Sequence, residues 1–184
     1  LGYREIYGIE PSADAVAKAR PEWRSRIHHS VLHKGLFPTS AFDLVACFQT
    51  LDHLASPNEF LQVVWDILKP GGGVLVLNHD VRAWSVRLFG ERSPIFDIEH
   101  PYLYDQRTIR TLFELNGFMA LEVGLAVNRY PIGYWLQITP LPDFVRGLVN
   151  TVLSMTKLAQ RRLKLAAGNL YLIGRKPSSE TGGP

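Results

Sequence analysis

The clearest pattern of hydrophobic and polar positions lies between residues 42 and 80. Residues 42–48 (FDLVACF) form a short apolar run with no charge after Asp43, which is typical of a strand buried on both faces. Residues 74–78 (VLVLN) form a second run of this kind. Between the two runs, apolar side chains recur on one helical face, at Phe60, Leu61, Val64, Ile67 and Leu68. The pattern predicts a β-α-β unit, and therefore a parallel sheet with a right-handed crossover.

The predicted helix of this unit has signals at both ends. Ser56 fits the N-cap position, Pro57 fits the first helical position, and Glu59 completes a capping box. Residues 69–73 (KPGGG) end the helix, because proline cannot continue it and glycine accepts the turn.

Shorter patterns on either side extend this alternation of strands and helices. Residues 5–9 predict a strand, Ser12 caps an alanine-rich helix, and residues 25–31 predict a polar edge strand. Further on we expect a short helix around 84–89, a helix that Asp105 begins and Gly117 ends, and strands at 118–125 and 170–174. We expect one domain over residues 1–177, followed by a disordered tail at 178–184.

The stretch from about residue 128 to residue 166 does not follow the alternation. Residues 128–142 (NRYPIGYWLQITPLP) carry three prolines and three aromatic residues, so they do not suit an interior strand. They predict either a lid over a site or a packing insert. Residues 144–165 predict an amphipathic helix with a basic end, which we expect to cover a sheet. Peripheral contact with a membrane or a partner through 144–165 is the alternative.

Composition narrows the class of protein. The chain has 184 residues, 46% of them hydrophobic, and a net charge of +3, which describes a globular domain without the basic patch that nucleic-acid binding requires. Cys47 is the only cysteine, so intrachain disulfides and cysteine metal sites are excluded. The sequence has no secretory signal and no run of 18 apolar residues, so we expect a cytoplasmic protein without an integral membrane segment.

Two polar features are candidates for chemistry. Glu10 follows the first predicted strand and precedes a helix, where a carboxylate can accept hydrogen bonds from both hydroxyls of a ribose. The structural alternative is that Glu10 only favours the helix dipole. The histidines between residues 28 and 33 lack a supporting acid or cysteine at helical spacing, so we expect no metal site there.

Taken together, several motifs resemble the class I S-adenosylmethionine (SAM)-dependent methyltransferases. They are YGIEPSADAVAKAR, FDLV followed by the acid-His-Leu element Asp52-His53-Leu54, FLQVVWDILKPGGGVLVL, HPYLYDQRTIRTLFELNGF and GNLYLIGRKP. The resemblance implies an α/β, Rossmann-like sheet in the order 3-2-1-4-5-7-6, with strand 7 antiparallel and helices on both faces. It also implies SAM as cofactor and a small-molecule acceptor.

The resemblance assigns roles to particular residues. Glu10 matches the acid that binds the cofactor's ribose. The end of the strand before the acid-His element runs beside the methionine part of the cofactor, at Phe48, Gln49 and Thr50, and Asp52 and His53 form that element. Acceptor contacts are expected at Asn78 and Asp80, with Tyr102 and Tyr104 lining the same site. His79 and His100 are the candidates for a general base, since histidine titrates near neutral pH.

The sequence departs from the family pattern in two places. No acid follows the second predicted strand, so the adenine contact is unassigned. Strand 1 and its glycine-rich loop have no counterpart in the sequence, and Gly71–Gly73 belong to a later turn. Because strand 1 is central in the sheet, we expect the chain to be the C-terminal part of a longer methyltransferase.

The function implied is SAM-dependent methyl transfer to a small molecule. The apolar composition of 128–155 favours a sugar-lipid, quinone-like or polyketide acceptor. Two alternatives are a degenerate methyltransferase-like module that binds a partner without activity, and a nicotinamide-dependent oxidoreductase or epimerase, since Glu10 suits that cofactor's ribose too. The LKPGG and DHL motifs argue against the nicotinamide enzyme.

Overall fold

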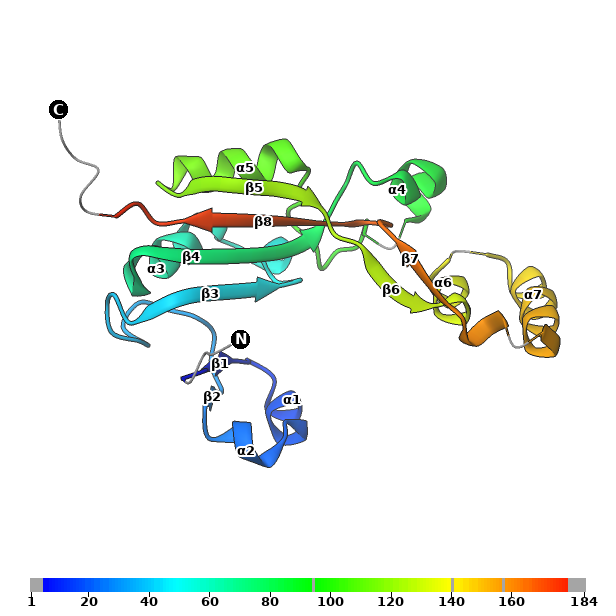
Figure 1. Ribbon diagram of the computed structural model, residues 1–184, viewed down its shortest axis with the longest axis horizontal. Helices are drawn as coiled ribbons and strands as arrows, with labels where there is room; N and C mark the ends of the chain where they lie inside the picture. Colours follow the sequence, from blue (N-terminus) through cyan, green and yellow to red (C-terminus); the bar gives the residue numbers. More distant parts are fainter. Residues whose placement is uncertain (1–4, 94, 140, 157, 179–184) are drawn as a thin grey trace.

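The computed structural model describes residues 5–93, 95–139, 141–156 and 158–178 (Figure 1). Its centre is a four-stranded sheet in the order β3-β4-β8-β5. The strands are β3 (Phe42–Phe48), β4 (Leu68–His79), β8 (Asn169–Arg175) and β5 (Met119–Leu125). β3 and β4 are parallel, whereas β8 runs antiparallel to both β4 and β5. β3, β4, β8 and β5 correspond to strands 4, 5, 7 and 6 of the predicted sheet. The observed order therefore confirms this half of the prediction, including the antiparallel strand 7.

A second, two-stranded parallel sheet lies beside β3. It pairs β1 (Gly8–Ile9) with β2 (Ile27–His28), and α1 (Ala13–Lys18) and α2 (Pro21–Arg24) connect the two strands. The side chain of Ser12 accepts a hydrogen bond from the amide of Ala15, so the predicted cap of α1 is confirmed. Ring contacts join this unit to the start of β3, because Tyr7 and Phe37 both lie against Phe42.

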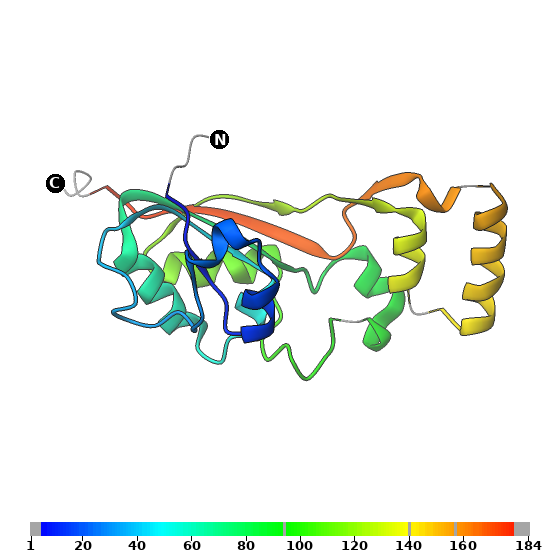
Figure 2. The same cartoon turned by 90° about the horizontal axis from the view of Figure 1, so that it is seen from below.

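Two helices cover one face of the main sheet, as Figure 2 shows from below. They are α3 (Pro57–Ile67) and α5 (Gln106–Leu115). The core lies between them and the strands, and its fully buried members include Leu61, Val64, Val76, Phe113 and Leu172. The predicted inward faces of both helices are therefore confirmed. Helices were expected on both faces, but α3 and α5 lie on the same one.

The prediction that β3 is buried on both faces is wrong. Only Cys47 is fully buried in this strand, while Leu44 is 39% exposed and Phe48 is 58% exposed. The reason is the position of β3 at the edge of the sheet: among the described strands it pairs with β4 alone. An apolar run does not reveal whether a strand will have one neighbour or two.

The predicted ends of α3 need two corrections. Ser56 makes no capping hydrogen bond with its side chain, so the capping box is wrong, although Pro57 does occupy the first helical turn. Residues 69–73 are the beginning of β4 rather than a turn. Glycine is still required there, because a Cβ on Gly72 would come within 2.9 Å of the carbonyl oxygen of Lys69.

Residues 126–168 form what we call the distal lobe, which projects beyond the end of the main sheet (Figures 1 and 2). It contains β6 (Asn128–Pro131), α6 (Ile132–Ile138), α7 (Asp143–Thr156), the 3₁₀ turn η3 (Leu158–Gln160) and β7 (Arg162–Leu165). The helix predicted over 144–165 therefore ends earlier, and its last residues instead form β7, which pairs antiparallel with β6.

Two further facts bear on the predicted domain organisation. No helix in the described ranges is long and apolar enough to cross a membrane. The predicted disordered tail lies outside the described residues except for Ser178.

Candidate active site

The carboxyl ends of β3 and β4 bring most of the predicted site residues together. β3 is followed by the 3₁₀ turn η1 (Leu51–His53), and β4 ends at His79. Because the two strands are parallel neighbours, the segments that follow them lie at the same edge of the sheet. Asp52 is only 1% exposed there, and Asn78 is fully buried.

Asp52 and His79 form a hydrogen-bonded pair. The Nδ1 atom of His79 lies 2.8 Å from Oδ2 of Asp52. Burial alone would raise the pKa of the Asp52 carboxyl, but the hydrogen bond from His79 and its charge outweigh burial, so the net pKa is lowered. The carboxylate of Asp52 accepts a hydrogen bond from Nδ1 of His79, and in the imidazole tautomer with its proton on Nδ1 the lone pair lies on Nε2.

His53 and His100 complete the cluster. The ring of His100 lies 4.5 Å from that of His53 and 5.0 Å from that of His79, between centroids. His53 Nδ1 lies 2.8 Å from the carbonyl oxygen of Glu99, so this histidine ties η1 to the loop that carries His100. The Nδ1 atom of His100 is buried without a hydrogen-bond partner among the described residues, as is Oδ1 of Asp52.

The cluster has the ligand types of a cation site. Asp52, His79 and His100 each offer one atom, and the three atoms lie within 4.8 Å of one another. Two imidazoles and a carboxylate suit a transition metal. However, Nδ1 of His79 and Oδ2 of Asp52 already form a hydrogen bond of 2.8 Å, which favours a hydrogen-bonded dyad for proton transfer.

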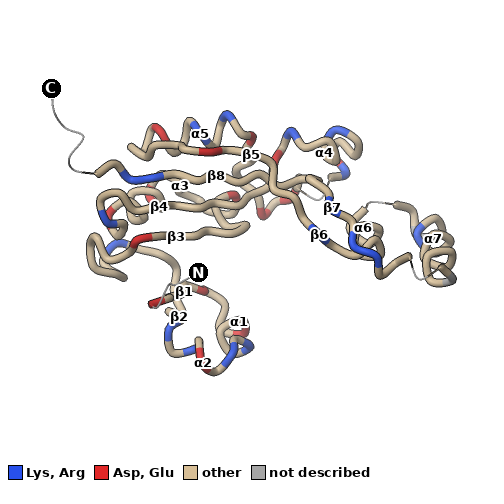
Figure 3. The backbone as a smooth tube through the Cα atoms, viewed as in Figure 1, with Lys and Arg blue, Asp and Glu red and all other residues tan. Residues whose placement is uncertain are grey.

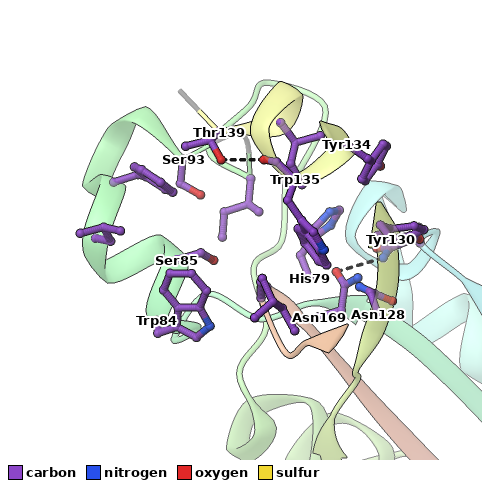
Figure 4. A pocket seen from close by; sticks show the side chains of 18 residues that line it. His79, Trp84, Ser85, Ser93, Asn128, Tyr130, Tyr134, Trp135, Thr139 and Asn169 are labelled. Atoms are coloured by element: carbon purple, nitrogen blue, oxygen red, sulfur yellow. Dashed lines mark hydrogen bonds between the residues drawn. The ribbon is translucent and has the colours of Figure 1, made fainter. Parts of the chain in front are cut away.

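A cavity of about 610 Å³ opens next to this dyad (Figure 4). His79 and Gln49 line it on the side of the main sheet. The other walls come from α4 (Trp84–Phe89), from β6 and α6 of the distal lobe, and from the residues that precede β8. Most of the cavity wall is aromatic or aliphatic, including Trp84, Leu88, Tyr130, Tyr134, Trp135 and Ile138.

Hydrogen bonds hold the aromatic walls in place. The indole of Trp84 donates to the carbonyl of Ala166 at 2.9 Å, and that of Trp135 donates to the carbonyl of Leu163 at 3.2 Å. Gln49 donates from Nε2 to Oδ1 of Asn169 at 3.1 Å, which links the end of β3 to the start of β8. The walls are therefore fixed by contacts between segments that are distant in the sequence.

The sequence identified only part of this cavity. The aromatic and proline-rich stretch 128–142 was expected to be a lid or an insert, and its side chains do form one wall. Trp84, Gly168 and Asn169 gave no comparable signal, because nothing near them in the sequence marks them as neighbours of His79. A close approach of β8 to β4 is what places them there.

The predicted cofactor residues lie at the carboxyl ends of β1 and β3. Glu10 follows β1 and accepts a hydrogen bond from the amide of Ser12 at 2.8 Å through Oε1. Phe48 ends β3 with its ring largely exposed, and the hydroxyl of Thr50 donates to the carbonyl of Phe48 at 2.9 Å. Gln49 has a φ of 48°, a left-handed backbone that is uncommon outside glycine and often found at functional sites.

The remaining predicted acceptor residues do not line the cavity. Asp80 is buried and accepts a hydrogen bond from the amide of Arg82, and burial raises the pKa of its carboxyl. The hydroxyl of Tyr104 is buried without a partner among the described residues, and burial, followed by the charge of Asp52, raises its pKa. Asn78 and Tyr102 lie beside the dyad, with the amide of Tyr102 directed at the carbonyl of Asp52. Their role in acceptor binding stays a prediction.

Comparison with known proteins identifies the family. Residues 1–123 match the profile of the family described as "Methyltransferase domain", which covers more than half of the chain. The chain therefore belongs to this family, and the resemblance to class I SAM-dependent methyltransferases is confirmed.

Curated relatives show a narrower likeness. The chain is 29% identical over 96 residues to the mitochondrial ubiquinone biosynthesis O-methyltransferase of Saccharomyces cerevisiae, which covers 47% of this chain and 30% of the relative. It is 27% identical over 114 residues to the ubiquinone biosynthesis O-methyltransferase of Caulobacter vibrioides, which covers 61% of this chain and 44% of the relative. The chain thus spans less than half the length of these relatives.

Solved structures confirm the fold. A SAM-dependent methyltransferase from Thermotoga maritima superposes with a TM-score of 0.61 at 16% identity, covering 92% of this chain and 72% of that one. A cyclase superposes with a TM-score of 0.58 at 20% identity, covering 95% and 67%. Since proteins of this fold include a cyclase, the activity has to be argued from the site.

Proposed function

We propose that this chain catalyses SAM-dependent methyl transfer to a hydroxyl oxygen of a small, apolar molecule, with His79 as the general base. One observation carries the proposal: His79 lines the cavity while its Nδ1 is held by the buried carboxylate of Asp52. Membership of the methyltransferase family and the likeness to O-methyltransferases support the same chemistry.

The residues at the ends of β1 and β3 suit the cofactor. Glu10 lies at the end of β1, where a carboxylate accepts hydrogen bonds from ribose hydroxyls, and the exposed ring of Phe48 offers an apolar surface at the end of β3. The side-chain oxygen of Gln49 is buried without a partner among the described residues, so it is available to accept a hydrogen bond. When bound, SAM supplies a methyl group on a positively charged sulfur.

The dyad activates the acceptor's hydroxyl oxygen, which is the nucleophile. With SAM bound, Nε2 of His79 would take the hydroxyl proton as the acceptor oxygen bonds to the methyl carbon and the bond from that carbon to sulfur breaks, leaving its electron pair on S-adenosylhomocysteine. The carboxylate of Asp52 would stabilise the imidazolium that forms. A large part of the rate acceleration comes from holding donor and acceptor in line, and the fixed cavity walls contribute this alignment. Aromatic walls also exclude water from the reacting atoms.

The cavity favours an acceptor with a ring. Tyr130, Tyr134 and Trp135 lie within about 4.5–6.3 Å of one another between ring centroids, and they form a continuous aromatic surface. Such surfaces stack well on planar rings. Of the acceptor classes expected from the sequence, a quinone-like or polyketide phenol fits this surface better than a free sugar.

The proposal is tested with a panel of phenols, with and without an alkyl tail, and radiolabelled SAM. We expect transfer to a phenol oxygen, and a His79→Gln variant with a rate roughly 10²–10⁴-fold lower. Calorimetric binding of S-adenosylhomocysteine should be retained in His79→Gln and lost in Glu10→Ala. A chelator in the assay should not change the rate, because the dyad acts without a metal.

Three results would contradict the proposal. Absence of S-adenosylhomocysteine binding would favour the degenerate binding module. Binding without transfer to any oxygen, nitrogen or carbon acceptor would favour a cofactor-binding protein without this activity. Full activity in His79→Gln would show that the dyad takes no part in catalysis.

A further inference from the structure

The helix α7 exposes a row of large apolar side chains. Phe144, Leu148 and Val152 are 79%, 67% and 53% exposed, and their spacing of four residues places them on one face. The main contacts of α7 are with α6 and η3 inside the distal lobe. The expectation that this helix covers the main sheet is therefore wrong, and Figures 1 and 2 show it at the far end of the molecule.

The lobe that carries this row is strongly basic. Residues 126–168 contain six Lys or Arg and one Asp, whereas the rest of the chain contains fourteen Lys or Arg against sixteen Asp or Glu. Arg129, Arg161, Arg162 and Lys164 are exposed on β6, on β7 and just before β7. Figure 3 shows this end of the chain almost without acidic residues.

We propose that the distal lobe binds the surface of an anionic lipid bilayer, with α7 lying in the interface. α7 itself carries one Asp and one Arg, so the excess of basic residues comes from β6, from β7 and from the residue before β7. An amphipathic helix with exposed phenylalanine and leucine, beside such basic residues, is of the kind that lies in this plane. α7 has 14 residues and is about 21 Å long, too short to span a hydrocarbon core of about 30 Å. It therefore lies on the bilayer rather than across it.

Charge favours a lipid surface over a second copy of the chain. Pairing two distal lobes would bring two sets of like charges together, and the single Asp of each lobe does not balance them. Anionic headgroups supply the missing negative charge and attract each basic side chain near the surface. An anionic bilayer thus offers apolar contact to the row on α7 and negative charge to the basic side chains of the same lobe.

The same lobe supplies one wall of the cavity. Tyr130, Tyr134, Trp135 and Ile138 belong to β6 and α6, and they line the cavity next to His79. If the proposed function holds, an apolar acceptor dissolved in the bilayer would reach the cavity without crossing much water. Bilayer binding itself does not depend on the proposed function.

The test is co-sedimentation of the full chain with vesicles, without SAM. We expect binding to vesicles of phosphatidylglycerol and phosphatidylcholine, at least tenfold weaker binding to phosphatidylcholine alone, and weakening with added salt. The variant Phe144→Ser, Leu148→Ser, Val152→Ser should lose binding at least tenfold. Arg161→Glu combined with Arg162→Glu should lose binding to anionic vesicles in the same way.

A matched control uses exposed apolar residues outside the lobe. Leu115→Ser, Met119→Ser, Leu121→Ser alters three side chains that are 81%, 51% and 55% exposed on α5 and β5. It should bind vesicles as the unaltered chain does, and circular dichroism checks that both triple variants are folded. Equal binding by all variants would overturn the proposal. A dimer in sedimentation that the α7 variant abolishes would overturn it in favour of a second copy.

The two proposals fail separately. Loss of vesicle binding with normal S-adenosylhomocysteine affinity would reject only the bilayer surface. Normal vesicle binding without S-adenosylhomocysteine affinity would reject only the enzyme.

Discussion

At the scale of single residues, the pKa of the buried carboxyl of Asp52 depends on the groups around it. Burial raises this pKa, but the hydrogen bond and the charge of His79 lower it by more, so that the net pKa is lowered. A carboxyl with a lowered pKa contributes stability above its unfolded value of about 3.9, and this contribution is lost as the pH falls through the lower folded value. The catalytic role that we propose for Asp52 and its contribution to acid stability therefore rest on the same hydrogen bond.

The lowered pKa of Asp52 predicts how the variant Asp52→Asn behaves. At pH 7 the variant should be less stable than the unaltered chain. The difference should shrink as the pH falls below about 4, because Asp52 takes up its proton first in the unfolded chain and only at lower pH in the folded chain. Urea unfolding at a series of pH values measures the difference. Leu115→Ser, on an exposed part of α5, is the control, with a small difference that does not vary with pH. A difference for Asp52→Asn that is constant from pH 7 to pH 3 would contradict the argument.

At the scale of elements, helix caps separate a correct prediction from a wrong one. The side chain of Asp105 caps α5 by accepting a hydrogen bond from the amide of Thr108, and the hydroxyl oxygen of Thr108 accepts one from the amide of Asp105. Ser56 precedes α3 in the same position but makes no such bond. The sequences of the two sites offer equally good residues, so the difference arises from the backbone that leads into each helix.

The two caps give a paired prediction. Asp105→Ala should lower the free energy of unfolding by about 1 kcal/mol or more, because it removes the hydrogen bonds to α5 and the ion pair with Arg82. Ser56→Ala should change the free energy by only a few tenths of this amount, since no capping bond is lost. Denaturant unfolding of both variants measures the two values. Similar losses in both would show that Ser56 also caps its helix.

How far each element could be predicted depends on how local its cause is. The bounds of β3 were predicted correctly, because an apolar run between polar turns is a local signal. β6 and β7 were not predicted, because thirty residues separate the two strands and β6 ends in proline. In the site, the motifs did identify four residues of the cluster: Asp52, His53, His79 and His100. The hydrogen bond between Asp52 and His79 and the walls of the cavity could not be predicted, because they form only when segments distant in the sequence meet.

At the scale of the whole molecule, the two sheets leave β3 with a single strand neighbour. Among the described strands, β4 and β8 each have neighbours on both sides, whereas β3 and β5 form the edges of their sheet. The small sheet β1–β2 lies beside the beginning of β3, where the ring of Tyr7 contacts that of Phe42. The expected position of strand 1 in the family sheet lies between β1 and β3.

This arrangement predicts a gradient of amide hydrogen exchange. Amides at 74–78 and 170–174 should exchange more slowly than those at 44–48, because they belong to strands that are paired on both sides. Exchange followed by mass spectrometry at two protein concentrations measures the gradient. Protection of 44–48 equal to that of 74–78 at both concentrations would contradict a free edge. Protection that appears only at the higher concentration would show that the edge pairs with another chain.

The position of β8 also sets the order in which the sheet can form during synthesis. β8 occupies residues 169–175 but lies between β4 and β5, which precede it by many residues. Until the ribosome has released this segment, β4 and β5 have no partner between them, and Asn169 cannot meet Gln49 at the cavity. The sheet and the site are therefore completed in one late step, and a nascent chain that stops before residue 169 exposes two apolar strands to chaperones and proteases.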